Sequence, residues 1–186
     1  MEQRLIFAGF GGQGVMLTGQ LVAYAGMLEG KHVAWIPSYG PEMRGGTANC
    51  NVTVSDRPIA SPIVYEPTGA IVLNQPSLDK FGPLVIPGGV LLINASLIGE
   101  SSRRVDIRQL RLAANDLANG LGNLKVANMV LLGALLRLTS VVHVESIMAA
   151  LQKILPPHRH NLLPVNRAAL ETGMAQATPA VALQGR

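Results

Sequence analysis

The stretch RLIFAGFGGQGVMLTGQLVAYAGML, residues 4–28, joins an apolar run to a glycine-rich loop and then to a helical pattern. Residues 4–9 predict a short buried strand, and residues 15–28 repeat apolar side chains at helical spacing as far as Glu29-Gly30. Between them, GFGGQG at residues 9–14 fits the G-x-G-x-x-G pattern, in which backbone N–H groups at a helix start approach an anionic group. The stretch therefore predicts an α/β fold whose first loop borders a ligand crevice.

The segments that follow extend the same sheet. Residues 32–37, HVAWIP, predict a second strand and so a β–α–β start with a crossover helix. Residues 48–55, ANCNVTVS, alternate apolar and polar side chains, which indicates a strand with one buried face, antiparallel or near an edge. Three more strands are predicted at residues 70–74, 89–94 and 105–110, with a short helix at 76–81.

Helical patterns fill the remainder of the chain, at residues 112–119, 126–138, 144–155 and 162–173. The expected architecture is a three-layer, Rossmann-like α/β sheet, mostly parallel, with at least one antiparallel or edge strand and a helical C-terminal third. Residues 1–174 are expected to form one domain. Residues 175–186 are small and uncharged until the last residue, which predicts a disordered tail.

Composition narrows the classes of function. The 186 residues carry a net charge of +4 with only 4% aromatic side chains, too few for the stacking platforms of a single-stranded nucleic-acid binder. The single cysteine, Cys50, excludes an internal disulfide and any multi-cysteine metal or iron–sulfur site. The most apolar segment, residues 126–142, is interrupted by polar side chains and is too short to span a bilayer. We expect a cytoplasmic protein that binds neither membrane nor nucleic acid.

The glycine loop by itself leaves three functions open. A dinucleotide site needs an acidic residue near the end of the second strand, and residues 34–38 contain none. Ser38 followed by Arg44 could replace that acid and bind a ribose 2′-phosphate, so a free-standing NADP-binding reductase is one alternative. A subunit that serves assembly alone, with its glycines needed only for close packing, is another.

A second loop, SYGPEMRGG at residues 38–46, has glycines and a proline that indicate a specific backbone conformation. Loops at the carboxyl ends of the first two strands face one crevice, which would bring Arg44 near the helix start. A guanidinium beside exposed amides suits a phosphate or carboxylate, although Glu42 could pair with Arg44 and hold the loop. Tyr39 is expected at the rim, and Asn128 either satisfies nearby backbone or touches a ligand.

Four motifs, in order along the chain, carry a family resemblance: GFGGQG, SYGPEMRGGTANCNVTVS, NQPSLDKF and KVANMVLLGAL. Together they resemble the gamma subunit, or gamma domain, of the 2-oxoacid:ferredoxin oxidoreductases, over residues 4–173. The SYGPE-x-RGG form is most similar to gamma chains of the 2-oxoglutarate and branched-chain enzymes, which makes 2-oxoglutarate the expected substrate.

The resemblance implies an enzyme that uses thiamine diphosphate to decarboxylate a 2-oxoacid, passes electrons through iron–sulfur clusters to ferredoxin, and transfers the acyl group to coenzyme A. This chain has no Gly-Asp-Gly segment with a downstream Asn to hold the magnesium of thiamine diphosphate, so it is expected to bind no cofactor tightly and to be inactive alone. Its implied partners are the alpha and beta subunits, with a ferredoxin-like delta subunit as a further candidate. A homodimer of the isolated chain is an open alternative.

The loops are then expected to face the active-site crevice, the coenzyme A path or the neighbouring subunits. No catalytic residue and no metal ligand are expected in this chain. The residues expected to bind a cofactor or ligand are Gly9, Gly11, Gly12, Gln13, Gly14, Ser38, Tyr39, Arg44, Gly45, Gly46 and Asn128.

Overall fold

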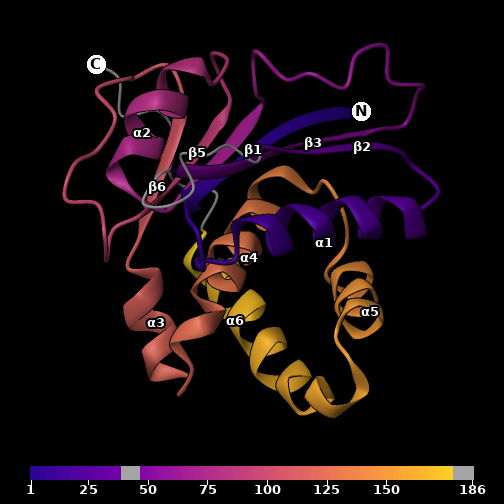
Figure 1. Ribbon diagram of the computed structural model, residues 1–186. Helices are drawn as coiled ribbons and strands as arrows, with labels where there is room; N and C mark the ends of the chain where they lie inside the picture. The colour runs from indigo at the N-terminus through magenta and orange to yellow at the C-terminus, as the bar shows by residue number, and fades with distance from the viewer. Residues whose placement is uncertain (39–46, 178–186) are drawn as a thin grey trace.

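The computed structural model describes residues 1–38 and 47–177, which form a six-stranded sheet with helices on both faces (Figure 1). The strands are β1 (Glu2–Phe10), β2 (His32–Ser38), β3 (Thr47–Ser55), β4 (Gly69–Val72), β5 (Val90–Asn94) and β6 (Arg108–Leu112). The α-helices are α1 (Val15–Leu28), α2 (Gln75–Phe81), α3 (Ala114–Gly120), α4 (Ala127–Thr139), α5 (Val144–Ile154) and α6 (Leu163–Gln176). Short 3-10 turns are η2 (Gly82–Leu84), η3 (Leu124–Val126) and η4 (Pro157–Leu162).

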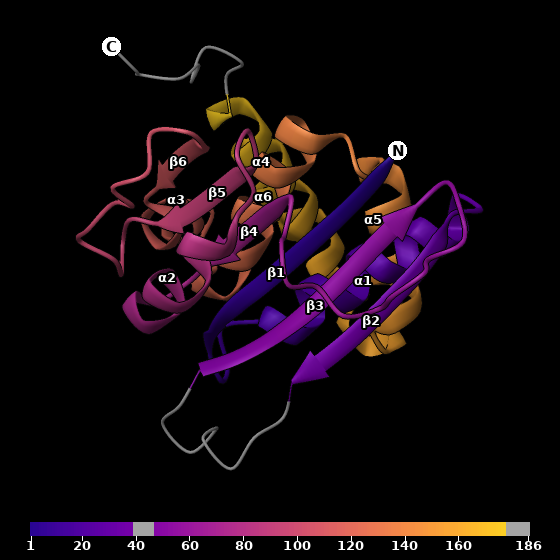
Figure 2. The same ribbon diagram turned by 90° about the horizontal axis from the view of Figure 1, so that it is seen from above.

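The strand order is β2-β3-β1-β4-β5-β6, as the view in Figure 2 shows. The pairs β1–β4, β4–β5 and β5–β6 are parallel, whereas β3 is antiparallel to both β1 and β2. This confirms the prediction of a mostly parallel sheet with an antiparallel strand. On this side of the sheet the edge strand is β2, and β3 lies next to it, between β1 and β2, so the crossover through α1 passes over β3.

The two faces of the sheet bury separate cores. Leu5 and Phe7 of β1 pack with α1 and α4 on one face, while Ile6 and Ala8 face the core that α2 covers. On the first face, α5 packs against α1 and α6 against α4, so the C-terminal third is helical as expected (Figure 1). The arrangement confirms the three-layer architecture.

The polar side of β3 is more buried than its alternating pattern predicts. Thr53 and Ser55 are almost fully buried, although they point away from α1. The reason is that the chain after β3 folds back over this face, where Val64 joins the second core and Arg57 N donates a hydrogen bond to Ser55 Oγ at 3.1 Å.

The most apolar segment of the sequence forms α4, an inner helix. Ten of its thirteen residues are buried, including Gly133, which lies against the backbone of Leu170 on α6. None of the helices that the structure describes has the length and apolar character needed to cross a bilayer. Helix α6 ends at Gln176, three residues beyond the helix expected at residues 162–173, and residues 178–186 lie outside the described part of the chain.

A polar cluster joins the end of α1 to the start of α5. The Glu29 carboxylate accepts a hydrogen bond from the backbone N–H of His143 at 2.7 Å. It also forms an ion pair with Lys31 Nζ at 2.9 Å. Lys31 Nζ also donates to the carbonyl oxygen of Val141 at 2.6 Å. Burial raises the pKa of Glu29, but the hydrogen bonds from His143, Ser146 and Lys31 outweigh it and lower the pKa to about 2.

Candidate functional site

The candidate site is a crevice at the carboxyl ends of the central parallel strands. From β1 the chain enters α1 on one face, whereas from the adjacent β4 it enters α2 on the other, so the two connections diverge. Such a switch point is where open α/β sheets bind ligands. A cavity of about 190 Å³ opens here, and its polar lining comprises Gly12, Gln13, Asn94, Asn115, Lys125 and Asn128.

Gln13 sets the shape of the glycine loop from within. Its Oε1 accepts a hydrogen bond from Phe10 N at 2.6 Å, and its Nε2 donates to the carbonyl oxygen of Leu73 at 3.3 Å. The side chain therefore links the loop after β1 to the end of β4. A Cβ at Gly9 would lie 2.6 Å from Gln13 Oε1, so the absence of a side chain at Gly9 makes this arrangement possible.

Asn128 and Gly14 meet although 114 residues separate them. The Nδ2 group of Asn128 donates to Thr18 Oγ1 at 3.0 Å and to the carbonyl oxygen of Gly14 at 3.4 Å. Gly14 has φ of 80°, in the left-handed region, and a Cβ there would lie 2.6 Å from Asn128 Nδ2. The structure thus brings together two predicted site residues, and Asn128 holds the loop from helix α4.

The remaining predicted residues fall into two groups. Gly11 and Gly12 border open space, since a Cβ on either would meet no atom within 4 Å. Ser38 ends β2 at the same edge of the sheet as the glycine loop. It pairs with Asn49 of β3, which pairs with Ala8 of β1, so Ser38 lies two strands, or about 10 Å, from β1. Tyr39, Arg44, Gly45 and Gly46 lie outside the described residues, so their part in the site stays a prediction.

Three polar residues that line the cavity were not predicted from the sequence: Asn94, Asn115 and Lys125. Asn94 ends the predicted strand GVLLIN, a position that could have been found by considering the carboxyl end of every strand. Its Nδ2 donates to Asn115 Oδ1 at 2.8 Å. No local signal identified Asn115 or Lys125, because only packing of α3 and η3 brings them to the crevice.

The crevice suits an anionic ligand group. Helix α1 begins without an acidic residue in its first turn and without a side-chain cap, so no carboxylate of its own first turn offsets its positive end. Lys125 adds a cation, and none of the residues lining the cavity is acidic. The carboxylate of Asp116, on α3, accepts a hydrogen bond from Ser96 Oγ at 3.1 Å and does not line the cavity.

The residues that the structure describes do not fit a metal or an iron–sulfur cluster. Among residues 1–38 and 47–177, no three His, Cys, Asp or Glu side chains gather as a metal site would require. The one cysteine, Cys50, is buried beneath α1, and burial raises the pKa of its thiol to about 11. A buried thiol of this kind is a small apolar side chain and not a metal ligand.

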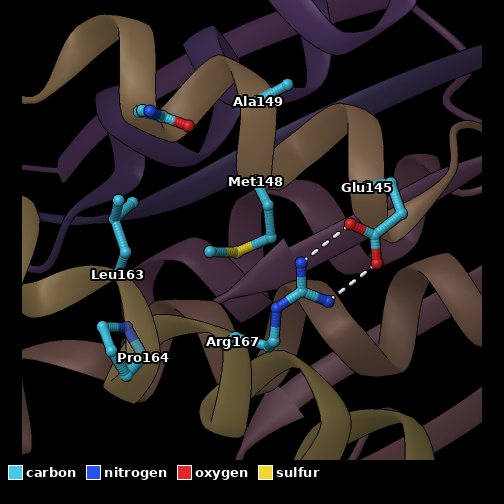
Figure 3. Close-up of a pocket in the computed structure, with 7 residues that line it drawn as sticks. Glu145, Met148, Ala149, Leu163, Pro164 and Arg167 are labelled. Carbon is cyan, nitrogen blue, oxygen red and sulfur yellow. Dashed lines mark hydrogen bonds and ion pairs between the residues drawn. The ribbon is translucent and has the colours of Figure 1, made fainter.

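A larger hollow, of about 480 Å³, lies between α5 and α6 (Figure 3). Met148, Leu163 and Pro164 line it, and a bidentate ion pair closes one side, with both Arg167 nitrogens 2.7 Å from Glu145 oxygens. Because the two charged groups satisfy each other, the hollow offers a ligand little beyond an apolar surface. We therefore regard the crevice as the better candidate.

The comparisons with known proteins agree with this architecture. A family model described as pyruvate ferredoxin/flavodoxin oxidoreductase matches residues 4–176. The chain belongs to this family. The resemblance to the gamma chains of 2-oxoacid:ferredoxin oxidoreductases is confirmed.

Among the relatives in this family, the 2-oxoglutarate synthase subunit KorC of Methanocaldococcus jannaschii is 36% identical over 159 residues, covering 84% of this chain and 85% of that subunit. The ketoisovalerate oxidoreductase subunit VorA of Methanothermobacter thermautotrophicus is 42% identical over 137 residues, 74% of this chain, but this chain spans only 28% of VorA. The crystal structure of a keto/oxoacid ferredoxin oxidoreductase gamma subunit from Geobacter sulfurreducens superposes with a TM-score of 0.81 at 31% identity, covering 94% of this chain and 98% of that one.

Proposed function

We propose that this chain is the gamma subunit of a 2-oxoglutarate:ferredoxin oxidoreductase. The assembled enzyme would decarboxylate 2-oxoglutarate with thiamine diphosphate, transfer the succinyl group to coenzyme A and pass two electrons to ferredoxin through iron–sulfur clusters. The observation that carries the proposal is the match to KorC, which covers more than four-fifths of both chains. The matched region of this chain therefore corresponds to most of a subunit whose name refers to a 2-oxoglutarate enzyme.

A branched-chain 2-oxoacid is the second candidate substrate. The higher identity to VorA, 42%, favours it, although the matched region is a minor part of the VorA chain. In this proposal the residues that hold thiamine diphosphate, and most of those that select the substrate, belong to other subunits. We propose the alpha and beta subunits as those partners, with a ferredoxin-like delta subunit as a further one.

Within the assembled enzyme, we propose that the crevice faces coenzyme A and the neighbouring subunits. Coenzyme A carries several phosphate groups, and the positive end of α1 with Lys125 supplies the complementary potential. Phe10 and Leu124 stand exposed beside the loop and the cavity, and apolar side chains of this size at a polar crevice suit a protein contact.

The fold disfavours the alternative of a free-standing NADP-binding reductase. In a dinucleotide-binding fold the strand after the first crossover helix lies beside the first strand, and its end binds the adenosine ribose. Here β3 occupies that position and runs in the opposite direction, while Ser38 lies one strand farther out. The glycine loop therefore lacks the neighbour that a dinucleotide needs.

Co-expression with the partner subunits tests the proposed function. The complex would be isolated with and without this chain and assayed for coenzyme A-dependent reduction of ferredoxin by 2-oxoglutarate, 2-oxoisovalerate and pyruvate. We expect activity only in the complex that contains this chain, with the highest kcat/KM for 2-oxoglutarate. A complex that assembles and works equally well without the chain would refute the proposal, and a higher kcat/KM for 2-oxoisovalerate would favour the branched-chain enzyme.

A further inference from the structure

The sheet has two outer edges, β2 and β6 (Figure 2). Along β6, the N–H of Arg108 donates to the carbonyl oxygen of Gly89 at 2.8 Å, and the carbonyl oxygen of Leu112 accepts from the residue after β5 at 2.7 Å. Both groups therefore face β5. Because backbone groups alternate between the two sides of a strand, Gln109 and Arg111 direct their N–H and C=O groups away from the sheet. Among the residues that the structure describes, none bonds to these four groups, so they are free to pair with another strand.

The two edges are protected from unwanted pairing in different ways. Pro37 has no backbone N–H and lies one residue before the end of β2, which makes that edge a poor template for an added strand. Strand β6, with the sequence RQLRL, contains no proline. Its protection is positive charge, which repels basic strands and attracts acidic ones.

The positive charge of the chain is concentrated at this edge. Residues 101–112 contain four arginines and one aspartate, which gives a net charge of +3, while the whole chain carries +4. Arg104 pairs with Asp106, whereas the side chains of Arg103 and Arg108 make no ion pair or hydrogen bond with any described residue. Arg111 donates only to neutral carbonyl oxygens in the loop after β5. Three guanidinium groups therefore have no carboxylate partner.

The surroundings of the β6 edge suit contact with a protein. Arg108 lines a hollow of about 340 Å³ at the amino ends of β1, β5 and β6. Arg104 Nη1 donates to the carbonyl oxygen of Pro83 at 3.1 Å, which brings the segment before β6 beside η2. Next to these two residues along the chain, Val105 is 68% exposed and Leu84 is 43% exposed. Apolar side chains beside unpaired cations favour a polypeptide over a small ion.

The charge also decides which polypeptide fits. A second copy of this chain, paired through its own β6, would set arginine against arginine, and like charges opposite each other on neighbouring strands are destabilising. Residues 178–186 contain no Asp or Glu, so that segment lacks the complementary charge. The remaining occupant is a segment of another chain that carries acidic side chains.

We propose that the outer edge of β6 binds an acidic, extended segment of a partner subunit as an additional strand. The backbone of that segment pairs with Gln109 and Arg111, and a carboxylate opposite Arg108 pairs with its guanidinium. Opposite residues on neighbouring strands have Cβ atoms about 5 Å apart, which a glutamate and an arginine span easily. The inference rests on the proposed function for the origin of the segment. It adds the surface that this chain offers and the chemistry of what binds there.

Hydrogen exchange tests the backbone pairing without any substitution. Residue-resolved exchange would be compared between the isolated full chain and the complex with the other subunits. We expect the amides of Gln109 and Arg111 to exchange rapidly in the isolated chain and to be protected in the complex. The amide of Leu110, which faces β5, is the internal control and should be protected in both. Rapid exchange of the Gln109 and Arg111 amides in the complex would overturn the inference.

Binding of the chain to the purified complex of the other subunits tests the charge. Arg108→Glu should weaken binding by about tenfold at low salt and by less at high salt, because salt screens the repulsion that it introduces. Arg159→Glu, at an exposed arginine of η4, is the matched control and should bind as the wild type does. Equal affinities for the two variants would overturn the inference while leaving the gamma-subunit role intact.

A second matched pair isolates the outward N–H of the edge. Arg111→Pro and Arg111→Ala both remove the guanidinium, but only proline also removes the N–H, and proline is tolerated where the N–H faces away from the sheet. The proline variant should bind about fivefold more weakly than the alanine variant, as the loss of one hydrogen bond predicts. Equal binding by the two variants would contradict strand addition.

If the other subunits do not bind even the wild-type chain, the proposed function fails and the edge is tested on the isolated chain. The probe is then a peptide of alternating glutamate and valine with blocked ends, compared with its lysine and valine counterpart. In NMR spectra of the chain, the acidic peptide alone should shift the amide signals of Gln109 and Arg111. Shifts with both peptides, or with neither, would overturn the inference.

Discussion

Replacing Gly133 by alanine should destabilise the protein, although alanine is the better helix former. Gly133 lies in the buried middle of α4, and a Cβ there would come within 2.7 Å of the carbonyl carbon of Leu170 on α6. A Cβ on the opposing Gly173 would be equally close, 2.7 Å from the carbonyl carbon of Val130. These obstacles are backbone atoms, so no change of side-chain rotamer relieves the contact. The two helices must move apart.

The size of the effect follows from two opposing terms. Overpacking of a core costs about 1–3 kcal/mol, and a clash with rigid backbone belongs at the upper end. Alanine regains about 1 kcal/mol of helix propensity over glycine. The net loss is therefore about 2 kcal/mol, which corresponds to a fall in Tm of about 4–8 °C for a chain of this size.

Urea unfolding followed by circular dichroism would measure the change in the free energy of unfolding. Gly120→Ala is the matched control, because Gly120 is the last residue of α3 and a Cβ there would meet no atom within 4 Å. The control should be neutral or up to about 1 kcal/mol more stable than the wild type. If Gly133→Ala also proved as stable as the wild type, the close approach of α4 and α6 would not be what holds the C-terminal layer.

Two further substitutions probe the polar contacts. Glu29→Gln removes a carboxylate whose pKa is lowered from 4.5 to about 2. The wild type should therefore have a free energy of unfolding about 3 kcal/mol higher than the variant at pH 7, and this difference should shrink as pH falls from about 4.5 toward 2. Urea unfolding at pH 7 and pH 3 measures it, and a pH-independent difference would exclude the ion pair as the cause. Gly14→Ala forces a side chain into φ of 80° and displaces the Asn128 amide, which should cost about 3 kcal/mol in thermal unfolding and raise KM for coenzyme A. If the Gly14→Ala variant kept the wild-type thermal stability and the wild-type KM for coenzyme A, the loop would not depend on the contact between Gly14 and Asn128.

The local signals in the sequence were sufficient for the element types and for part of the site. The apolar run, the glycines and the 3.6-residue periodicity predicted β1, the loop and α1, because each depends on neighbours a few residues apart. Strict alternation also predicted β3 as a strand that is antiparallel or near an edge, and β3 is antiparallel to both of its neighbours. Gly14 and Asn128 were both predicted as site residues, one from its loop pattern and the other from a polar side chain on an apolar helix.

Sequence alone determined that a glycine-rich loop, predicted to bind an anionic group, opens a mostly parallel sheet, since glycine placement and hydrophobic period act through the local backbone. Tertiary structure decided what surrounds that loop. It inserted β3 between β1 and β2, which removed the dinucleotide geometry that a G-x-G-x-x-G match suggests. It also brought Asn94, Asn115 and Lys125 to the crevice. These placements depend on how strands pair and helices pack across more than 80 residues of chain, and no local pattern encodes such long-range contacts.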